Sequence, residues 1–191
     1  MDMNIVLASG SPRRYELLKM MGFDDFEVIA DDTEEIIIEG LEPEAQVIKL
    51  SLEKASNVAL LCNKETLIIA ADTLVYLDGR PLGKPDSKHD AEMMLKELSG
   101  RKHSVYTGVT LLRDDRFVSE VEKTDVYFRD ISNREVDAYV ETGEPMDKAG
   151  SYAAQGGAAV FIERIDGDFF NVMGLPLCRL SIMLKEFDTK L

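Results

Sequence analysis

Hydrophobic runs typical of strands alternate along this chain with stripes typical of helices. Residues 5–8 are a short apolar run, which predicts a strand. After Pro12, the side chains of Leu17, Leu18 and Met21 share one helical face, and Gly22 is a helix stop. Residues 26–29 predict a second strand, followed by an acidic loop. The chain therefore opens with a strand, a tight loop, a helix and another strand.

The middle of the chain contains the most hydrophobic strand pattern. A helix is predicted that opens at Glu42-Pro43-Glu44 and runs to about residue 61, with an apolar stripe at Ala45, Ile48, Leu52, Ala55 and Ala59. Residues 67–71 are continuously apolar, as in a strand buried on both faces, and this strand is predicted to end at Asp72-Thr73. Residues 74–77 continue extended to a hairpin turn at Asp78-Gly79.

The second half predicts a mixture of helices and antiparallel strands. It contains a helix over 87–98, a long hairpin from strands 102–113 and 116–129, and a helix over 132–142 with a capping box. Residues 143–157 show no period, as in a functional loop, and precede strands 158–165 and 169–172 and a last helix ending near 187. The long hairpin argues against a wholly parallel sheet. We therefore predict an α/β fold with a mixed twisted sheet and flanking helices, in a single domain spanning residues 1–191.

Charge and composition exclude several classes of function. The net charge of −14 opposes non-specific binding to nucleic acid or anionic membranes, but not binding of a small polyanion at a local basic site. We find no membrane span and no export signal, so Cys62 and Cys178 are expected to be reduced thiols in the cytoplasm. His89 and His103 are too scattered for a histidine metal site, so any metal would be a hard cation bound to carboxylates.

The first strand–loop–helix junction has the composition of an anion site. Ser9 and Ser11 supply hydroxyls, Pro12 suits the first helical position, and Arg13 and Arg14 place two cations at a helix N-terminus. Cations oppose the helix dipole there unless an anion lies between them. A phosphate site is the functional interpretation; a serine-capped helix with two solvated arginines is the alternative.

Two further patches share this chemistry. One contains Asp72-Thr73 and Lys84, and the other contains Asp147, Lys148 and Gln155. Basic groups and hydroxyls bind phosphates, carboxylates bind a divalent ion or orient water, and an amide can recognise the edge of a base. The patches together indicate phosphoryl or nucleotidyl chemistry. Taken without these patches, Lys54 on the long helix is interpreted as a surface lysine paired with a neighbouring glutamate.

These motifs also carry a family resemblance along nearly the whole chain. They are Leu7-Ala8-Ser9-Gly10-Ser11-Pro12-Arg13-Arg14, Glu53-Lys54-Ala55, Ala71-Asp72-Thr73, Gly83-Lys84-Pro85, Leu98-Ser99-Gly100, Asp147-Lys148-Ala149-Gly150, Gln155-Gly156 and Val172-Met173-Gly174-Leu175-Pro176. In this order the chain resembles the Maf, or septum-formation-protein, family of nucleoside triphosphate pyrophosphatases. The resemblance implies a fold like that of inosine-triphosphate pyrophosphatases, with two lobes around a substrate cleft. It also implies metal-dependent hydrolysis of a nucleoside triphosphate to a monophosphate and pyrophosphate.

The resemblance assigns roles to individual residues. Asp72 matches the proposed proton acceptor, and we favour a version in which a bound Mg²⁺ or Mn²⁺ lowers the pKa of the attacking water while Asp72 positions it. Glu35 matches an acidic position beside the metal, with Glu34 as the alternative. The phosphate-binding set comprises Ser9, Ser11, Arg13, Arg14, Lys54 and Lys84.

Three positions point to the substrate. The members of the family that resemble dTTP/UTP pyrophosphatases are matched at Arg14, Thr73 and Gln155. A glutamine amide can both donate and accept, so it can meet the paired carbonyl and N–H of uracil or thymine. Tyr152-Ala153-Ala154 departs from many relatives beside Gln155. The alternatives are a 7-methyl-GTP pyrophosphatase, a nucleotidyltransferase, and a non-catalytic nucleotide sensor linked to cell division. The last helix is interpreted as core, with a homodimer face as the alternative.

Overall fold

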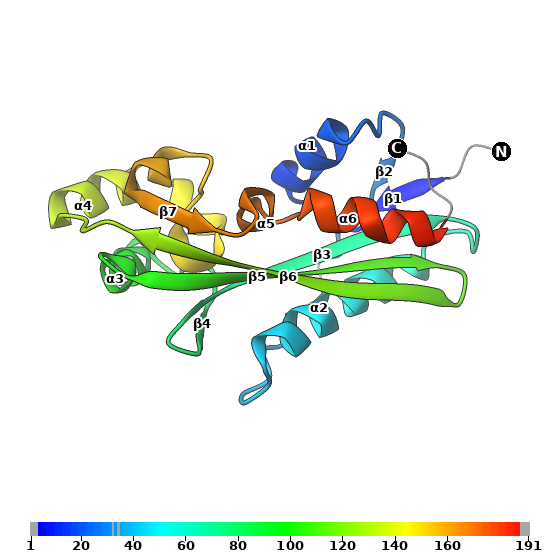
Figure 1. Ribbon diagram of the computed structural model, residues 1–191, viewed down its shortest axis with the longest axis horizontal. Coiled ribbons are helices and arrows are strands. Elements are labelled where there is room, and N and C mark those ends of the chain that lie inside the picture. The colour runs from blue at the N-terminus through cyan, green and yellow to red at the C-terminus, as the bar shows by residue number, and fades with distance from the viewer. Residues whose placement is uncertain (1–3, 32, 34, 188–191) are drawn as a thin grey trace. The chain divides into compact units, whose positions relative to one another are not determined.

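The computed structural model describes residues 4–31, 33 and 35–187 and has a mixed sheet flanked by helices (Figure 1). Seven strands have the order β2-β1-β3-β5-β6-β7, with β4 paired to β3. β1 is parallel to both its neighbours, whereas β4 and β7 pair antiparallel with β3 and β6. The strands are β1 (Ile5–Leu7), β2 (Glu27–Val28), β3 (Leu67–Leu77), β4 (Arg80–Leu82), β5 (Lys102–Arg113), β6 (Arg116–Phe128) and β7 (Ile162–Asp166). The predicted α/β class with a mixed sheet is confirmed.

The helices begin and end largely where the sequence indicates. Pro12 is the first residue of α1, the Ser87 side chain caps α3, and Ser132 and Glu135 form the predicted capping box of α4. The α-helices are α1 (Pro12–Met20), α2 (Pro43–Ala59), α3 (Lys88–Leu98), α4 (Asn133–Glu141), α5 (Phe169–Met173) and α6 (Leu177–Leu184). Short 3₁₀ helices are η1 (Glu144–Asp147), η2 (Ala149–Ser151), η3 (Gly157–Phe161) and η4 (Lys185–Phe187).

Contacts within the chain divide it into two compact units. Unit 1 contains the chain up to Asp72, the segment Thr107–Glu122 and the chain from Gly174 onward. Unit 2 contains Thr73–Tyr106 and Lys123–Met173. The boundary at Asp72 falls within β3, so the strand that carries the predicted catalytic residue contributes to both units.

In unit 1, α2 packs on one face of the sheet. Ala55 and Val58 of α2 contact a cluster formed by β1 and β3, including Val6, Ile68 and Ala70. The alternate β3 residues, Leu67 and Ile69, are also fully buried, and Figure 1 shows α1 and α6 on the side opposite α2. Burial on both faces explains the continuous apolar run of this strand.

The predicted apolar face of α2 is partly wrong. Ala45 is exposed, and the buried residues of α2 are Gln46, Val47, Leu50, Ser51, Ala55 and Val58. Two of these are polar and hydrogen-bonded: Gln46 pairs with the backbone of Ile36 and Ile38, and Ser51 with Thr110. A pattern of hydrophobic residues cannot predict which polar side chains are buried through hydrogen bonds to other segments.

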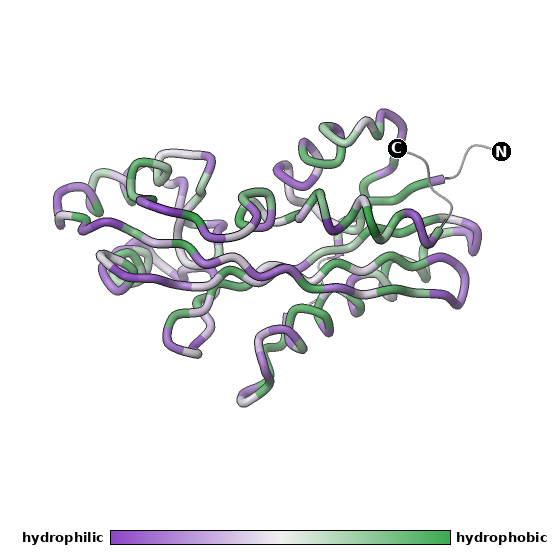
Figure 2. Tube along the Cα trace, viewed as in Figure 1, coloured by the Kyte–Doolittle hydropathy of each residue, from purple (hydrophilic) through white to green (hydrophobic). Residues whose placement is uncertain are grey.

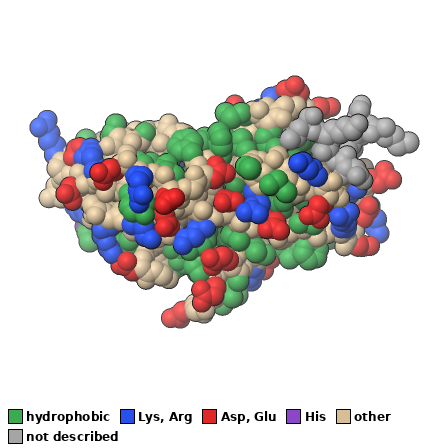
Figure 3. Space-filling view, viewed as in Figure 1, with side chains coloured by type: hydrophobic (Ala, Val, Ile, Leu, Met, Phe, Trp, Pro, Cys, Tyr) green, Lys and Arg blue, Asp and Glu red, His purple; other side chains and the backbone are tan. Residues whose placement is uncertain are grey.

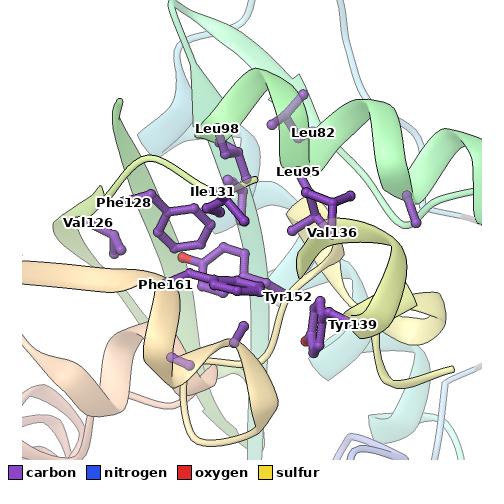
Figure 4. Packing of buried hydrophobic residues seen from close by; sticks show 14 of the residues in the cluster. Leu82, Leu95, Leu98, Val126, Phe128, Ile131, Val136, Tyr139, Tyr152 and Phe161 are labelled. Atoms are coloured by element: carbon purple, nitrogen blue, oxygen red, sulfur yellow. The ribbon is translucent and has the colours of Figure 1, made fainter. Parts of the chain in front are cut away.

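In unit 2, an aromatic cluster forms much of the core (Figure 4). The rings of Tyr152 and Phe161 lie beside Phe128, and the ring of Tyr139 lies beside Phe161. These contacts have edge-to-face geometry, with centroids 4.9–6.3 Å apart. Leu82, Leu95, Leu98 and Val136 complete this cluster from β4, α3 and α4. The 3₁₀ segments between residues 144 and 161 are thereby held on a packed core.

Three other sequence predictions are wrong. β3 continues through Asp72 to Leu77, so Asp72 lies in the middle of a strand and not at its end. Residues 157–161 are 3₁₀ helix before β7, and residues 169–173 form α5 instead of a partner strand. The Asp168 carboxylate accepts a hydrogen bond from Phe170 N at 2.8 Å, which satisfies one N–H at the start of α5.

Polar residues gather at turns and on the surface. Figure 2 shows a hydrophilic connection between β5 and β6, and Figure 3 shows acidic and basic side chains interspersed on the face it presents. Asp78 and Gly79 both have positive φ, as the predicted hairpin turn requires. Among the described residues, no helix has the length and apolar character needed to cross a membrane.

Candidate active site

A lysine bridges two carboxylates in unit 1. Lys54, on α2, donates hydrogen bonds from Nζ to Asp72 Oδ1 at 2.5 Å and to Glu35 Oε1 at 2.7 Å. The Asp72 side chain is 3% exposed and the Lys54 side chain 12%, whereas Glu35 is 36% exposed. Lys54 is therefore no surface lysine, and its charge compensates a carboxylate that is removed from solvent.

The second carboxylate oxygen of Asp72 is unusual. Asp72 Oδ2 is buried and has no hydrogen-bond partner among the described residues. A buried acceptor without a partner costs about 1–3 kcal/mol, and more when it is charged. This oxygen is consequently available to a water or a cation.

The serine–arginine loop lies beside this ion pair. β1 and β3 are parallel with Leu7 opposite Ile69, and Ala8 N donates to Ile69 O at 2.8 Å, so the loop after β1 leaves the sheet near Asp72. Burial lowers the pKa of the Arg14 guanidinium, while the carboxylates of Asp72 and Glu35 act in the opposite direction. The loop and the carboxylates thus form one electrostatic site within unit 1.

Arg14 is fixed by two hydrogen bonds in this loop. Its Nε donates to Gly174 O at 2.7 Å and its Nη1 donates to Ser9 Oγ at 3.2 Å. Ser9 Oγ also accepts from Ser11 N at 3.2 Å, which closes the turn before α1. The Ser11 side chain makes no cap hydrogen bond with α1, and Arg13 is half-buried in its first turn. Hydroxyls, two guanidiniums and a helix N-terminus therefore come together, as predicted.

The acidic segment before α2 is bound by a helix side chain that the sequence did not indicate as a site residue. Asn57 Nδ2 donates to Asp31 Oδ2 at 3.1 Å and Thr33 Oγ1 at 3.2 Å, one turn beyond Lys54. A pocket of about 220 Å³ lies here, lined by Asp31, Thr33, Glu35, Ile36, Leu50, Glu53, Lys54 and Asn57. The available signal was the spacing of Gln46, Leu50, Lys54 and Asn57, which places them on one stripe of a helix. Glu34, the alternative to Glu35, lies outside the described residues.

The remaining predicted residues belong to unit 2. Thr73 follows Asp72 in β3 and is half-buried, and Lys84 is exposed just after β4. Gly150 N donates to Gly83 O at 3.0 Å, which joins the segment containing Lys84 to the Asp-Lys-Ala-Gly segment. Lys148 is bound locally, by the Asp147 carboxylate and by Glu144 O at 2.9 Å.

Gln155 occupies the corner of a tight turn in unit 2. Gly156 N donates to Ala153 O at 3.0 Å, so residues 153–156 form the turn and Gln155 is its third residue. Ala153 and Ala154 are buried, whereas Gln155 is exposed. The turn is therefore anchored by two buried alanines and exposes the Gln155 side chain to solvent.

Comparison with known proteins agrees with these motifs. The model of the family described as "Maf-like protein" matches residues 4–187. The chain belongs to this family. A relative from Thermoanaerobacter sp. (strain X514) is 47% identical over 99% of this chain and 100% of its own length, and one from Methanosarcina barkeri (strain Fusaro / DSM 804) is 50% identical over 95% and 93%. Both relatives are named dTTP/UTP pyrophosphatase.

A solved structure extends the comparison to the fold. The structure of a HAM1 protein from Coxiella burnetii superposes with a TM-score of 0.54 at 17% identity, over 97% of this chain and all of that one. At this identity the likeness concerns the fold alone. The family resemblance inferred from the sequence motifs is confirmed by the family match.

Proposed function

We propose that this Maf-like protein is a nucleoside triphosphate pyrophosphatase that hydrolyses dTTP and UTP to the monophosphate and pyrophosphate. Relatives similar over their whole length carry that name. The structural observation that carries the proposal is the Lys54–Asp72 pair, with its second carboxylate oxygen buried and unbonded among the described residues. A sensor of nucleotides would need no such oxygen.

Asp72 is the proposed catalytic residue. Its Oδ1 is held by Lys54, so Oδ2 has a fixed direction and can accept a hydrogen bond from the attacking water. Water adds across the anhydride between the α and β phosphates: one new P–O bond forms, the bridging P–O bond breaks, and pyrophosphate leaves. Asp72 orients the water and holds its proton as the new bond forms.

The basic groups bind the triphosphate in this proposal. The negative charge of the triphosphate is bound by Arg13, Lys54 and the N–H groups at the start of α1. The hydroxyls of Ser9 and Ser11 are further hydrogen-bond donors. Arg14 organises the loop through Ser9 and Gly174, and Lys84 is a further phosphate-binding residue that the family motifs predict. Phosphoryl transfer depends chiefly on such positioning and charge stabilisation.

The residues present also fit a hard divalent cation, Mg²⁺ or Mn²⁺. Asp72 Oδ2 and the half-exposed Glu35 carboxylate would hold it, with Lys54 balancing the remaining charge. Among the described residues no three His, Cys, Asp or Glu side chains form a metal cluster. Two carboxylates suit Mg²⁺, which keeps waters and phosphate oxygens as its other ligands. When bound, such an ion lowers the pKa of a water and neutralises phosphate charge.

Gln155, Thr73 and Arg14 are the proposed specificity residues. The exposed amide of Gln155 can donate and accept at the same time, which matches the carbonyl and N–H edge of uracil or thymine. Cytoplasmic location remains a prediction from the sequence, and a homodimer remains the alternative to a core role for the last helix.

Release of pyrophosphate from a panel of nucleoside triphosphates, with Mg²⁺, Mn²⁺ or chelator, tests the proposal. We expect metal-dependent release from dTTP and UTP and little from purine triphosphates. Release from 7-methyl-GTP instead would retain the reaction and overturn the specificity. Binding without release from any nucleotide would favour the sensor alternative.

A further inference from the structure

The turn that carries Gln155 is bound on both sides by two side chains outside it. Ala153 N donates to the Tyr139 hydroxyl at 3.1 Å, and Gly157 N donates to Glu144 Oε2 at 2.9 Å. These N–H groups lie two residues before and two residues after Gln155. All of these residues belong to unit 2.

Tyr139 and Glu144 also lie close to each other. Burial and the neighbouring Glu144 carboxylate raise the pKa of Tyr139. Tyr139 is 5% exposed, and its ring packs edge-to-face on Phe161 at 5.5 Å (Figure 4). The tyrosine is therefore a rigid support, and the Glu144 carboxylate is bound by Gly157 N.

The glycines after Gln155 fit this arrangement. A Cβ on Gly156 would lie 2.2 Å from Glu144 Oε1, and a Cβ on Gly157 would lie 3.2 Å from Tyr139 Cε2. Neither glycine has the positive φ that would itself require glycine. The turn thus approaches Glu144 and Tyr139 so closely that a Cβ at position 156 would displace the Glu144 carboxylate.

We propose that Tyr139 and Glu144 are positioning residues for nucleobase specificity, because they fix the turn from which Gln155 reads the base. This inference rests on the proposed function. A mobile turn would let Gln155 withdraw and admit a larger base. A fixed turn holds the backbone of Gln155 in place, so a pyrimidine fits against its amide and a larger purine is excluded.

The ratio of kcat/KM for UTP to that for ATP measures this effect. We expect Tyr139→Phe, which removes only the hydroxyl, to lower the ratio by roughly tenfold, the equivalent of about one hydrogen bond. Glu144→Ala should lower it similarly, whereas Glu144→Gln, which keeps an acceptor for Gly157 N, should restore most of it. In a Gln155→Ala background, Tyr139→Phe should change the ratio no further. Tyr127→Phe, a half-buried tyrosine of β6, is the matched control.

The outcomes separate this inference from the proposed function. If the unaltered protein releases no pyrophosphate from UTP, the proposed function fails. If it does so, but Tyr139→Phe and Glu144→Ala both keep the wild-type ratio, or lower it equally with and without Gln155, the positioning role is wrong. Glu144→Ala gives the same test should Tyr139→Phe fold poorly.

Discussion

Lys54 holds one carboxylate oxygen of Asp72 at 2.5 Å and leaves the other buried without a hydrogen-bond partner among the described residues. An ion pair formed only for stability would be expected to satisfy both oxygens, because an unbonded buried acceptor is costly. The arrangement is better explained by a task for the second oxygen. It also makes the roles of the two residues separable by mutation.

Asp72→Asn should sharply lower turnover while preserving the fold. The amide has the same shape but is a much weaker proton acceptor, so we expect kcat for UTP to fall by about 1,000-fold, within the range of lost general-base catalysis. Pyrophosphate release and thermal melting measure the two effects. Asp24→Asn, which alters an exposed carboxylate paired with Lys19, should leave kcat unchanged. Unchanged turnover in Asp72→Asn would contradict the catalytic assignment.

Lys54→Met should destabilise the protein as well as inactivate it. Removing the lysine leaves the 3%-exposed Asp72 carboxylate without its counter-charge, so the free energy of unfolding should fall by about 3 kcal/mol. The comparison is Lys49→Met on the same helix, which breaks the more exposed pair with Glu53 and should cost less than about 1 kcal/mol. Urea denaturation of both variants gives the difference. Equal losses would mean that the Lys54–Asp72 pair behaves as a surface pair.

Acidification should lower the free energy of unfolding, because His103 is buried in its neutral form. This side chain is 1% exposed and hydrogen-bonded to the Tyr152 hydroxyl at 2.8 Å, and burial lowers its pKa from 6.5 to about 4. The unfolded state then binds more protons between pH 6.5 and 4, so stability is full above pH 6.5 and falls as pH drops toward 4. The contribution is about 3 kcal/mol over that window.

Urea denaturation of the wild type and of His103→Gln at pH 7 and pH 4.5 isolates this contribution. The wild type should lose more stability on acidification than the variant, whose amide does not titrate. The same pH dependence in both proteins would show that other groups cause the loss.

Gly108→Ala should disturb the contact between β5 and α2. A Cβ on Gly108 would lie 2.2 Å from Val47 O, and backbone atoms cannot move aside as a flexible side chain can. We expect a loss of about 2 kcal/mol or more, comparable to overpacking of a core. Gly83→Ala is the matched substitution, because no atom lies within 4 Å of its Cβ position. Differential scanning calorimetry should show a lowered melting temperature for the first variant only.

The sequence predicted where the helices lie better than it predicted which of their residues are buried. Periodicity located α2, and the capping residues located α3 and α4, because local chemistry determines these features. The face of α2 was misjudged since Gln46 and Ser51 are buried through hydrogen bonds to distant segments. Residues 169–172 were predicted as a strand because a short segment with Phe169, Phe170 and Val172 fits either structure. Hydrogen bonds of the Asp168 and Asn171 side chains stabilise the helix found here.

The site was predictable as a set of residues, but not as an arrangement. Motifs named Ser9, Arg14, Lys54 and Asp72, and the structure brings these four together in unit 1. Nothing in the pattern indicated that Lys54 bridges Asp72 and Glu35, or that Asn57 holds the acidic segment. Such pairings depend on tertiary contacts between segments 18 to 26 residues apart in sequence.

The most direct test of the central claim identifies the products formed from UTP. Phosphorus NMR of UTP incubated with the protein and Mg²⁺ should show UMP and pyrophosphate appearing in equal amounts, and about 1,000-fold more slowly with the Asp72→Asn variant. Formation of UDP and orthophosphate would mean that a different anhydride is cleaved. That result, or UTP left intact, would contradict the account.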